Sequence, residues 1–598
     1  MRLVRAAGAA SLALLAALAL LGPAAPAAGQ EAPTGSTLRV GLTTDLYTSN
    51  PLRACGCGAE YEWLALNYDM LLRFDRETLG PAPGLATEVP TVDNGGISAD
   101  GLTYTFRIRP GVTWSDGEPV TSRDVAFTYR FILDNGIGAY DNYLPFDPTF
   151  ETPDDATLVW RMSEPNLSPL SPPWIPILPE HIWSTFDGDA RAAKRFENIP
   201  AVGSGPFHLV AWDEGRSWTV EANPDYWDGA PKVDRIVFTA YENVETLTLA
   251  LRDGELDLVS GLTPTLADSL DGVPDIAVHE AQGRGFMNLA FNFGGQGPQA
   301  TNHPALADLA VREAIAYAID KEALVERVLL GRGVVGQGLM PPRSPWFWTP
   351  PPGEERSYDP GRAADLLDGA GYLDTDGDGV REMPGGGLPL AFEFVAINSV
   401  PSAVPSAKLI ADWLGEIGID VTVKPVGDGG MNEAWGAGDF DALLWGWNPD
   451  PDPDFILSIF TTDECLDWSD GCYSDPAYDA LYRAQQIAAT PEERAAVVAE
   501  MEAKVYADVA ELVLYYESDL EAYRTDRFEG FTPVPAPDGY MVFGYLPYPY
   551  MDIRPIAAGA APTQGGGIPP WVIGLAVLGV LVGVLAVRAR RATEDERN

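Results

Sequence analysis

The sequence DFDALLWGWNPDPDPDF at residues 439–455 contains the end of a buried strand, and this feature decides the fold class. Residues 440–447 form an apolar run typical of such a strand, and alternating prolines and aspartates follow at once. Proline cannot donate to a sheet ladder, so the strand must end near Asn448. In α/β proteins, ligands bind beyond the carboxyl ends of strands, so Trp447, Asn448 and Asp450 are predicted to line a pocket. A turn of solvated carboxylates is the alternative.

Length and composition indicate a large globular protein with several domains. The chain has 598 residues. This is too long for one hydrophobic core, so about two to four domains are expected. Its 86 acidic and 39 basic residues give a formal net charge of −47. This balance argues against nucleic acid as a partner, since little basic surface is present to neutralise phosphates, and it mildly favours cationic ligands.

Both ends of the chain carry segments typical of export and membrane attachment. Two arginines, an apolar run and small residues make residues 1–29 a predicted secretory signal peptide. A Gly/Pro-rich linker at 557–570 leads into a predicted transmembrane helix at 571–587, and arginines in the tail at 588–598 mark the cytoplasmic side. We therefore expect a single-pass protein of the cell membrane with an extracytoplasmic binding domain.

The four cysteines fall into two close pairs, Cys55 with Cys57 and Cys465 with Cys472. In an exported protein this spacing favours disulfides, although three pairings are formally open. We predict a bond between Cys465 and Cys472, with Cys55 and Cys57 as the second pair. Metal binding is less favoured, because the histidines are scattered and none has ligand spacing.

Strand and helix signals alternate along the chain, which is typical of an α/β fold. Strands are predicted at residues 38–42, 103–109, 158–162, 207–212, 218–222, 235–239, 256–259, 286–293, 390–397, 420–424 and 512–516. Helices are predicted at residues 61–72, 245–252, 310–319, 321–330, 406–417, 477–488 and 491–508. A further helix is expected after Thr121, which forms a capping box with Asp124. No repeat is found, so a solenoid is not supported.

One acidic loop resembles the first half of an EF-hand calcium loop, because Asp374, Asp376 and Asp378 alternate around a glycine. Glu382 could supply a further ligand. Gly385 occupies the twelfth position, where an EF-hand has a bidentate glutamate. A plain Asp/Gly turn is therefore the favoured interpretation, with a structural calcium ion as the alternative; no other cofactor is expected.

The sequence shows no arrangement of residues typical of catalysis. Gly203-Ser-Gly205 does not complete a nucleophile elbow, and no phosphate-binding loop or zinc-protease motif occurs. Carboxylates two residues apart in a proline turn cannot flank a glycosidic bond, and we interpret Asp452 and Asp454 as solvated turn residues. We expect no enzymatic activity; an anchored hydrolase with a carboxylate-lined cleft is the alternative.

Six collinear segments of the chain match the pattern of a known family. They are FRIRPGVTWSDGEPVTSRDVAFTYR (106–130), ILPEHIW (177–183), GSGPFHL (203–209), NPDYWDGAPKVDRI (223–236), ALRDGELDLV (250–259) and VREAIAYAIDKEAL (311–324). Together they resemble the extracytoplasmic solute-binding proteins of ABC importers, the family that binds oligopeptides, dipeptides and nickel complexes. The resemblance covers nearly all of residues 38–550. It implies a receptor that closes on a solute and works with an ABC permease and its ATPase subunits; a sensor with the same fold is a further alternative.

The resemblance also implies the domain organisation. The expected fold is a large class II periplasmic-binding-protein-like fold, with two α/β lobes, a two-strand hinge and an extra inserted domain. Lobe one is expected at residues 36–72, 200–281 and 525–556, the inserted domain at 73–199, and lobe two at 282–524.

In peptide-binding members, a Gly-Trp-x-x-Asp segment at a strand end binds the peptide main chain, and its aspartate pairs with the terminal amine. Residues 446–450 match this segment, so Asp450 is implied to bind the amine, and the loop after Pro51 is implied to run beside the ligand. The implied ligand-binding residues are Gly446, Trp447, Asn448, Asp450, Cys55, Gly56 and Cys57.

Three features depart from the family pattern. Pro449 and Pro451 remove backbone donors that a peptide-like ligand would use, and the Cys55-Gly56-Cys57 sequence is unusual at its position. A membrane anchor at the C-terminus replaces the family's free or lipid-anchored form. A peptide is therefore the favoured ligand, while a dipeptide, a metal complex or another solute stays open.

Overall fold

The computed structural model describes residues 36–54, 59–137, 140, 144, 148–167, 169–170, 175–294, 302–465, 467–488, 490–542 and 544–556. The predicted signal peptide, linker, transmembrane helix and tail lie outside these ranges, and so do Cys55, Gly56 and Cys57. The described residues up to Pro555 belong to one compact unit. In the described part of the chain, none of the helices has the length and apolar character needed to cross a membrane.

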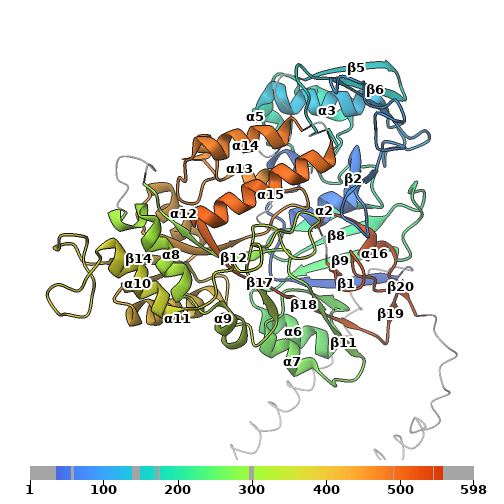
Figure 1. The fold of residues 1–598 in the computed structure, drawn as a ribbon. Helices are drawn as coiled ribbons and strands as arrows, with labels where there is room; N and C mark the ends of the chain where they lie inside the picture. The colour runs from blue at the N-terminus through green and yellow to red at the C-terminus, as the bar shows by residue number, and fades with distance from the viewer. Residues whose placement is uncertain are drawn as a thin grey trace, which may run out of the picture. The chain divides into compact units, whose positions relative to one another are not determined.

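The first large sheet has the strand order β11-β18-β10-β1-β9-β8-β7 among the described residues (Figure 1). Its strands are β1 (Thr37–Leu42), β7 (Phe207–Asp213), β8 (Ser217–Ala222), β9 (Arg235–Ala240), β10 (Leu258–Val259), β11 (Ile276–Ala281) and β18 (Asp519–Arg524). Helices α6 (Val244–Asp253) and α7 (Pro264–Leu270) pack on one face, where they contact Val259. The adjacent residue Leu258 points into the core on the other face, as the two-residue period of a strand requires.

The second large sheet has the order β13-β17-β12-β16-β14-β15. Its strands are β12 (Phe286–Phe291), β13 (Gly333–Val335), β14 (Ala391–Ile397), β15 (Asp420–Val426), β16 (Ala442–Trp447) and β17 (Glu511–Glu517). The helices associated with it are α8 (Leu309–Ala318), α9 (Lys321–Arg327), α10 (Pro360–Ala370), α11 (Ala403–Glu416) and α12 (Asp428–Ala437). Leu444 packs in the core that contains α11, and Leu443 packs against α12 on the opposite face. Both faces are therefore buried, which explains the continuous apolar run in this strand.

Three helices follow the proline-rich turn after β16. They are α13 (Asp454–Ser458), α14 (Pro476–Gln486) and α15 (Pro491–Asp508), and Figure 1 shows α14 and α15 side by side. Their apolar residues, including Leu457, Tyr478 and Met501, form a core with Phe286 and Tyr516 of the second sheet.

The segment between β1 and β7 contains a smaller sheet with the order β4-β6-β5. The elements here are α2 (Glu60–Asn67), β2 (Leu72–Phe74), β3 (Pro81–Pro83), β4 (Thr103–Arg107), α3 (Ser122–Asn135), β5 (Thr149–Asp154), β6 (Thr157–Arg161), α4 (Glu180–Trp183) and α5 (Ala190–Ala193). The last described elements of the chain are β19 (Phe528–Glu529), α16 (Tyr548–Met551) and β20 (Arg554–Pro555).

The predicted capping box of Thr121 and Asp124 is confirmed at the start of α3. The helix predicted at 61–72 ends earlier, because Tyr68 adopts an extended conformation.

Within the described residues, the chain crosses twice between the two large sheets. The first crossing is residues 282–285, between β11 and β12, and the second is Ser518, between β17 and β18. We expected lobe two to extend to residue 524, and this boundary is wrong, because β18 pairs with β10 and β11 in the first sheet. A single serine separates β17 from β18, and neither glycine nor proline occurs there to mark the change of sheet.

Candidate functional site

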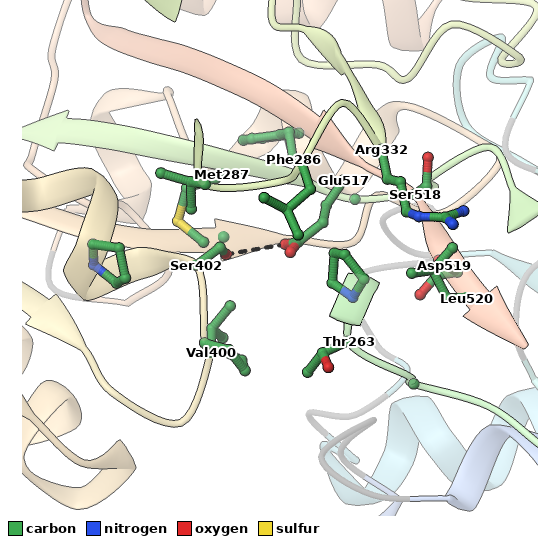
Figure 2. Close-up of a pocket in the computed structure, with 18 of the residues that line it drawn as sticks. Thr263, Phe286, Met287, Arg332, Val400, Ser402, Glu517, Ser518, Asp519 and Leu520 are labelled. Atoms are coloured by element: carbon green, nitrogen blue, oxygen red, sulfur yellow. Dashed lines mark hydrogen bonds between the residues drawn. The ribbon is translucent and has the colours of Figure 1, made fainter. Parts of the chain in front are cut away.

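A cavity of about 550 Å³ lies at the two chain crossings and at the carboxyl end of β16 (Figure 2). Six segments line it, and they come from both large sheets: residues 261–265, 285–287, 327–332, 397–405, 445–448 and 517–520. Its volume falls in the range typical of small-molecule sites, roughly 300–1,000 Å³. The cavity is therefore the candidate ligand-binding site.

The wall of the cavity is mainly apolar. Phe286, Met287, Val400, Trp445 and Trp447 contribute apolar surface. Hydrogen-bonding and charged groups are interspersed, namely Thr263, Thr265, Ser402, Asn448, Ser518, Arg327, Arg332, Glu517 and Asp519. This composition suits a ligand with an apolar body and a few polar groups.

The strand end predicted near Asn448 is confirmed, since β16 ends at Trp447. Gly446, Trp447 and Asn448 all line the cavity. A Cβ atom on Gly446 would lie 2.6 Å from the carbonyl oxygen of Phe286, so only glycine fits at this position of the strand. Gly285, just before β12, is restricted in the same way, because its Cβ would lie 2.7 Å from the carbonyl oxygen of Trp447.

Asp470 holds the two tryptophans of β16 in place. Its Oδ2 accepts hydrogen bonds from Trp447 Nε1 at 2.9 Å and from Trp445 Nε1 at 3.1 Å. Asn288 Nδ2 donates to the same oxygen and also to Glu511, at 3.1 Å and 2.9 Å. Burial raises the pKa of Asp470, and burial together with the Asp470 charge raises the pKa of Glu511. A buried acidic pair thus fixes the orientation of two indole rings in the cavity wall.

The disulfide between Cys465 and Cys472 is confirmed. It closes the short loop that carries Asp470. Sequence analysis missed Asp470, although an acid inside a predicted disulfide loop next to a tryptophan-rich strand end was a usable signal. Any bond of Cys55 with Cys57 lies outside the described residues.

Asp450 lies away from the cavity wall. Its Oδ1 accepts a hydrogen bond of 2.6 Å from the hydroxyl of Tyr545. It lines a separate cavity of about 40 Å³, together with Arg284, Arg343 and Tyr540. Of the segment 439–455, only residues 445–448 are among the described residues that line the larger cavity. Binding of an amine by Asp450 therefore stays a prediction from the family resemblance.

The interpretation of Asp452 and Asp454 as solvated turn residues is wrong. Arg494 of α15 donates to both carboxylate oxygens of Asp452, with two distances of 2.7 Å. Asp454 accepts hydrogen bonds from Tyr482 and Gln485 of α14, and burial raises its pKa. The two helices cover the turn, and carboxylates covered in this way must be paired.

The acidic loop at 374–382 brings four carboxylates together. One oxygen each of Asp374, Asp376, Asp378 and Glu382 lies within 4.8 Å of the others, and the three aspartates are exposed. Asp374 accepts hydrogen bonds from the amides of two loop glycines, at 2.7 Å and 3.1 Å, and Glu382 binds Thr375. A plain Asp/Gly turn makes such bonds without an ion, so both interpretations of the loop stay open.

A family profile and two related proteins match most of this chain. The profile of the bacterial extracellular solute-binding proteins, family 5 Middle, matches residues 80–466. Protein XP55 of Streptomyces lividans is 28% identical over 475 residues, which cover 78% of this chain and 81% of that protein. The oligopeptide-binding protein AppA of Bacillus subtilis is 26% identical over 403 residues, 65% of this chain and 69% of its own.

The fold is similar to that of solved structures. The crystal structure of NikZ from Campylobacter jejuni in complex with Ni(L-His) superposes with a TM-score of 0.72 at 22% identity. The superposition covers 87% of this chain and 99% of that one. Because the identity is low, this likeness shows the fold alone.

Proposed function

Because the chain belongs to the bacterial extracellular solute-binding proteins of family 5, we propose that it captures a peptide-like solute between its lobes and delivers it to an ABC import permease. The observation that carries the proposal is the cavity at the end of β16. Residues from both large sheets line this cavity, and it lies where the chain crosses from one sheet to the other. A hinge at these crossings would let the lobes close over a solute and expel water from it. The oligopeptide-binding relative in Bacillus subtilis supports a peptide-like solute.

Mass spectrometry of small molecules released from the denatured, purified protein tests this function. We expect one short peptide, or a narrow set of peptide-like compounds, because lobes that close over a fitted ligand would retain it during purification. Extracts of a Trp447→Ala variant are the matched control, and they should contain less of the same compounds. Recovery of a solute with neither amide nor amine groups would contradict the peptide assignment. Hydrolysis of added peptides by the pure protein would favour an anchored hydrolase instead.

We propose further that residues 571–587 anchor this receptor in the cell membrane, beside its permease. The support is the apolar sequence between a Gly/Pro-rich segment and the terminal arginines. A chain truncated before Ala557 is expected to appear in the soluble extracytoplasmic fraction, while the full chain stays with the membranes. Cell fractionation with immunodetection measures this, and a truncated chain that still sediments with membranes would show that another segment provides the anchor.

A further inference from the structure

Glu517 occupies a fixed position between the two chain crossings. It is the last residue of β17 and pairs with Gly333 of β13. Its main-chain carbonyl touches the first crossing so closely that a Cβ on Gly283 would lie 1.7 Å from it. The backbone of Glu517 is thus held by both crossings, which makes its side chain a well-placed group in the cavity wall.

The carboxylate of Glu517 points toward the open space of the cavity. Figure 2 shows it among the labelled side chains, reaching toward Ser402, with Val400 and Thr263 nearby. Ser402 Oγ donates a hydrogen bond of 3.1 Å to Oε2. This neutral partner orients the carboxylate but leaves its charge uncompensated.

The cations of the cavity wall are engaged elsewhere or exposed. Arg332 forms ion pairs with Asp268 and with Glu280, the latter at 2.7 Å. Arg327 is exposed at the end of α9, where water screens its charge. Within the described ranges, no ion pair of Glu517 is found. Glu517 is half-buried. A carboxylate that is partly shielded from water and lacks a cation is costly, and a cationic ligand group would offset that cost.

The acidity of Glu517 agrees with this environment. Burial raises the pKa of its carboxyl to about 7, the Ser402 hydrogen bond lowers it, and the Asp519 charge raises it further. Asp519 itself has the nearby Arg284 guanidinium as a compensating charge. The groups that interact with the Glu517 carboxylate from the elements around it are Ser402 before α11, Asp519 of β18 and Tyr515 of β17, while Arg332, in the same wall, is paired with Asp268 and Glu280.

We propose that Glu517 receives a positively charged group of the ligand, and that the ligand class is an amphipathic amine, with a protonated amine joined to an apolar body. This inference rests on the proposed receptor function and makes its ligand more specific. The apolar wall around Phe286, Met287 and Trp447 accommodates the body, and Glu517 supplies the only wall carboxylate, among the described residues, without a nearby compensating cation. Asp450, the residue implied by the family motif, lies in the smaller cavity with Arg284 and binds Tyr545.

Isothermal titration calorimetry with defined peptides tests the assignment. The probes are di-, tri- and tetrapeptides of alanine and leucine, each with a free amino terminus and in N-acetylated form. For the best free-amine probe, Glu517→Gln is expected to weaken binding by about 30-fold or more, because a buried charge partner is lost. The N-acetylated form should bind the wild type more weakly and respond little to the substitution. Glu322→Gln, which removes an exposed carboxylate of α9 outside the wall, is the charge-matched control and should leave affinity unchanged.

The wild type alone offers a second measurement, which does not depend on the folding of a variant. Affinity for the free-amine probe should fall by about tenfold for each pH unit below 7, as Glu517 becomes protonated, and affinity for the acetylated probe should not.

Three results would overturn the inference, and they separate it from the receptor function. Equal affinity of Glu517→Gln and wild type for a free-amine probe removes Glu517 from the site but leaves the receptor function intact. Loss of affinity in Asp450→Asn with none in Glu517→Gln assigns the amine to Asp450. If no probe binds the wild type, the peptide-receptor function itself fails, and the inference fails with it.

Discussion

Replacing Arg494 with leucine is expected to lower the free energy of unfolding by about 3 to 5 kcal/mol, the usual cost of removing one partner of a buried ion pair. The Arg494 and Asp452 side chains are only 9% and 14% exposed, and the guanidinium contacts both carboxylate oxygens. Its Nε also donates to Gln485 at 2.9 Å. Without the cation, Asp452 would stay buried beside Asp454, and two close carboxylates would lack compensation.

Urea unfolding of the two proteins, followed by circular dichroism, measures the effect. Arg483→Leu is the matched control, because Arg483 pairs with Glu164 where both side chains are about half exposed, at 54% and 49%. Such a pair contributes about 0 to 1 kcal/mol. The double variant Arg494→Leu/Asp452→Asn should recover part of the loss, since it removes the orphaned charge as well. Equal small effects of Arg494→Leu and Arg483→Leu would contradict the structural role given to this pair.

The position of the pair links it to the cavity. Asp452 follows the motif residues 446–450 by two positions, and Arg494 lies in α15. The pair therefore fixes the turn that begins where Trp447 and Asn448 line the cavity. Stability of this turn and geometry of the cavity wall depend on the same contact.

Features set by neighbouring residues could be predicted from the sequence. The capping box of Thr121, the end of β16 at its prolines and the disulfide of Cys465 all depend on residues within about ten positions of one another, and all three are confirmed. Each follows from local chemistry. The Thr121 side chain caps its own helix, proline has no backbone N–H to donate to a strand ladder, and two thiols close together in the sequence can form a disulfide.

The features that could not be predicted depend on contacts between residues far apart in the sequence, and such contacts leave no local pattern. Ser402 and Glu517 are 115 positions apart, and Asp452 and Arg494 are 42 apart. The change of sheet at Ser518 has no glycine or proline to mark it. The formal net charge of −47 does not distinguish solvated acids from buried ones, yet several acids, among them Asp470, Glu502 and Glu511, are buried. Burial of a carboxylate is decided by what packs over it, and this is not visible in composition.

Glu502→Gln is expected to change the pH dependence of the free energy of unfolding by up to about 5 kcal/mol. Glu502 lies in α15 and is 1% exposed. Its Oε2 accepts a hydrogen bond of 2.8 Å from the Leu339 amide, while Oε1 has no hydrogen-bond partner among the described residues. Burial raises the pKa of this carboxyl from 4.5 to about 8. The folded protein therefore holds the proton over a pH range in which the unfolded chain has already released it.

The sign of the effect follows from this difference in bound protons. Between pH 4.5 and 8 the folded state binds more protons at Glu502 than the unfolded state, so the contribution of Glu502 to stability is fully present below pH 4.5 and is lost as the pH rises to 8. Each pH unit costs about 1.4 kcal/mol over this window. Glutamine cannot ionise, so the variant lacks this loss. Its amide oxygen can still accept from Leu339, but its buried NH₂ group costs about 1 to 3 kcal/mol if it finds no acceptor.

The two stability profiles should therefore cross. Below pH 5 we expect the Glu502→Gln variant to be the less stable protein, because only the burial cost of the amide acts there. Near pH 8 it should be the more stable one, because the wild type has lost the contribution of its proton. Urea unfolding from pH 4.5 to 8.5 measures both profiles, and Glu500→Gln, an exposed site in the same helix, should leave the wild-type profile unchanged. Buried acids that do not interact with Glu502 titrate equally in wild type and variant, while Glu511, whose pKa the Glu502 charge raises, adds to the difference between the profiles. Parallel profiles would mean that Glu502 is ionised in the folded protein, and that α15 provides a compensating group for its charge.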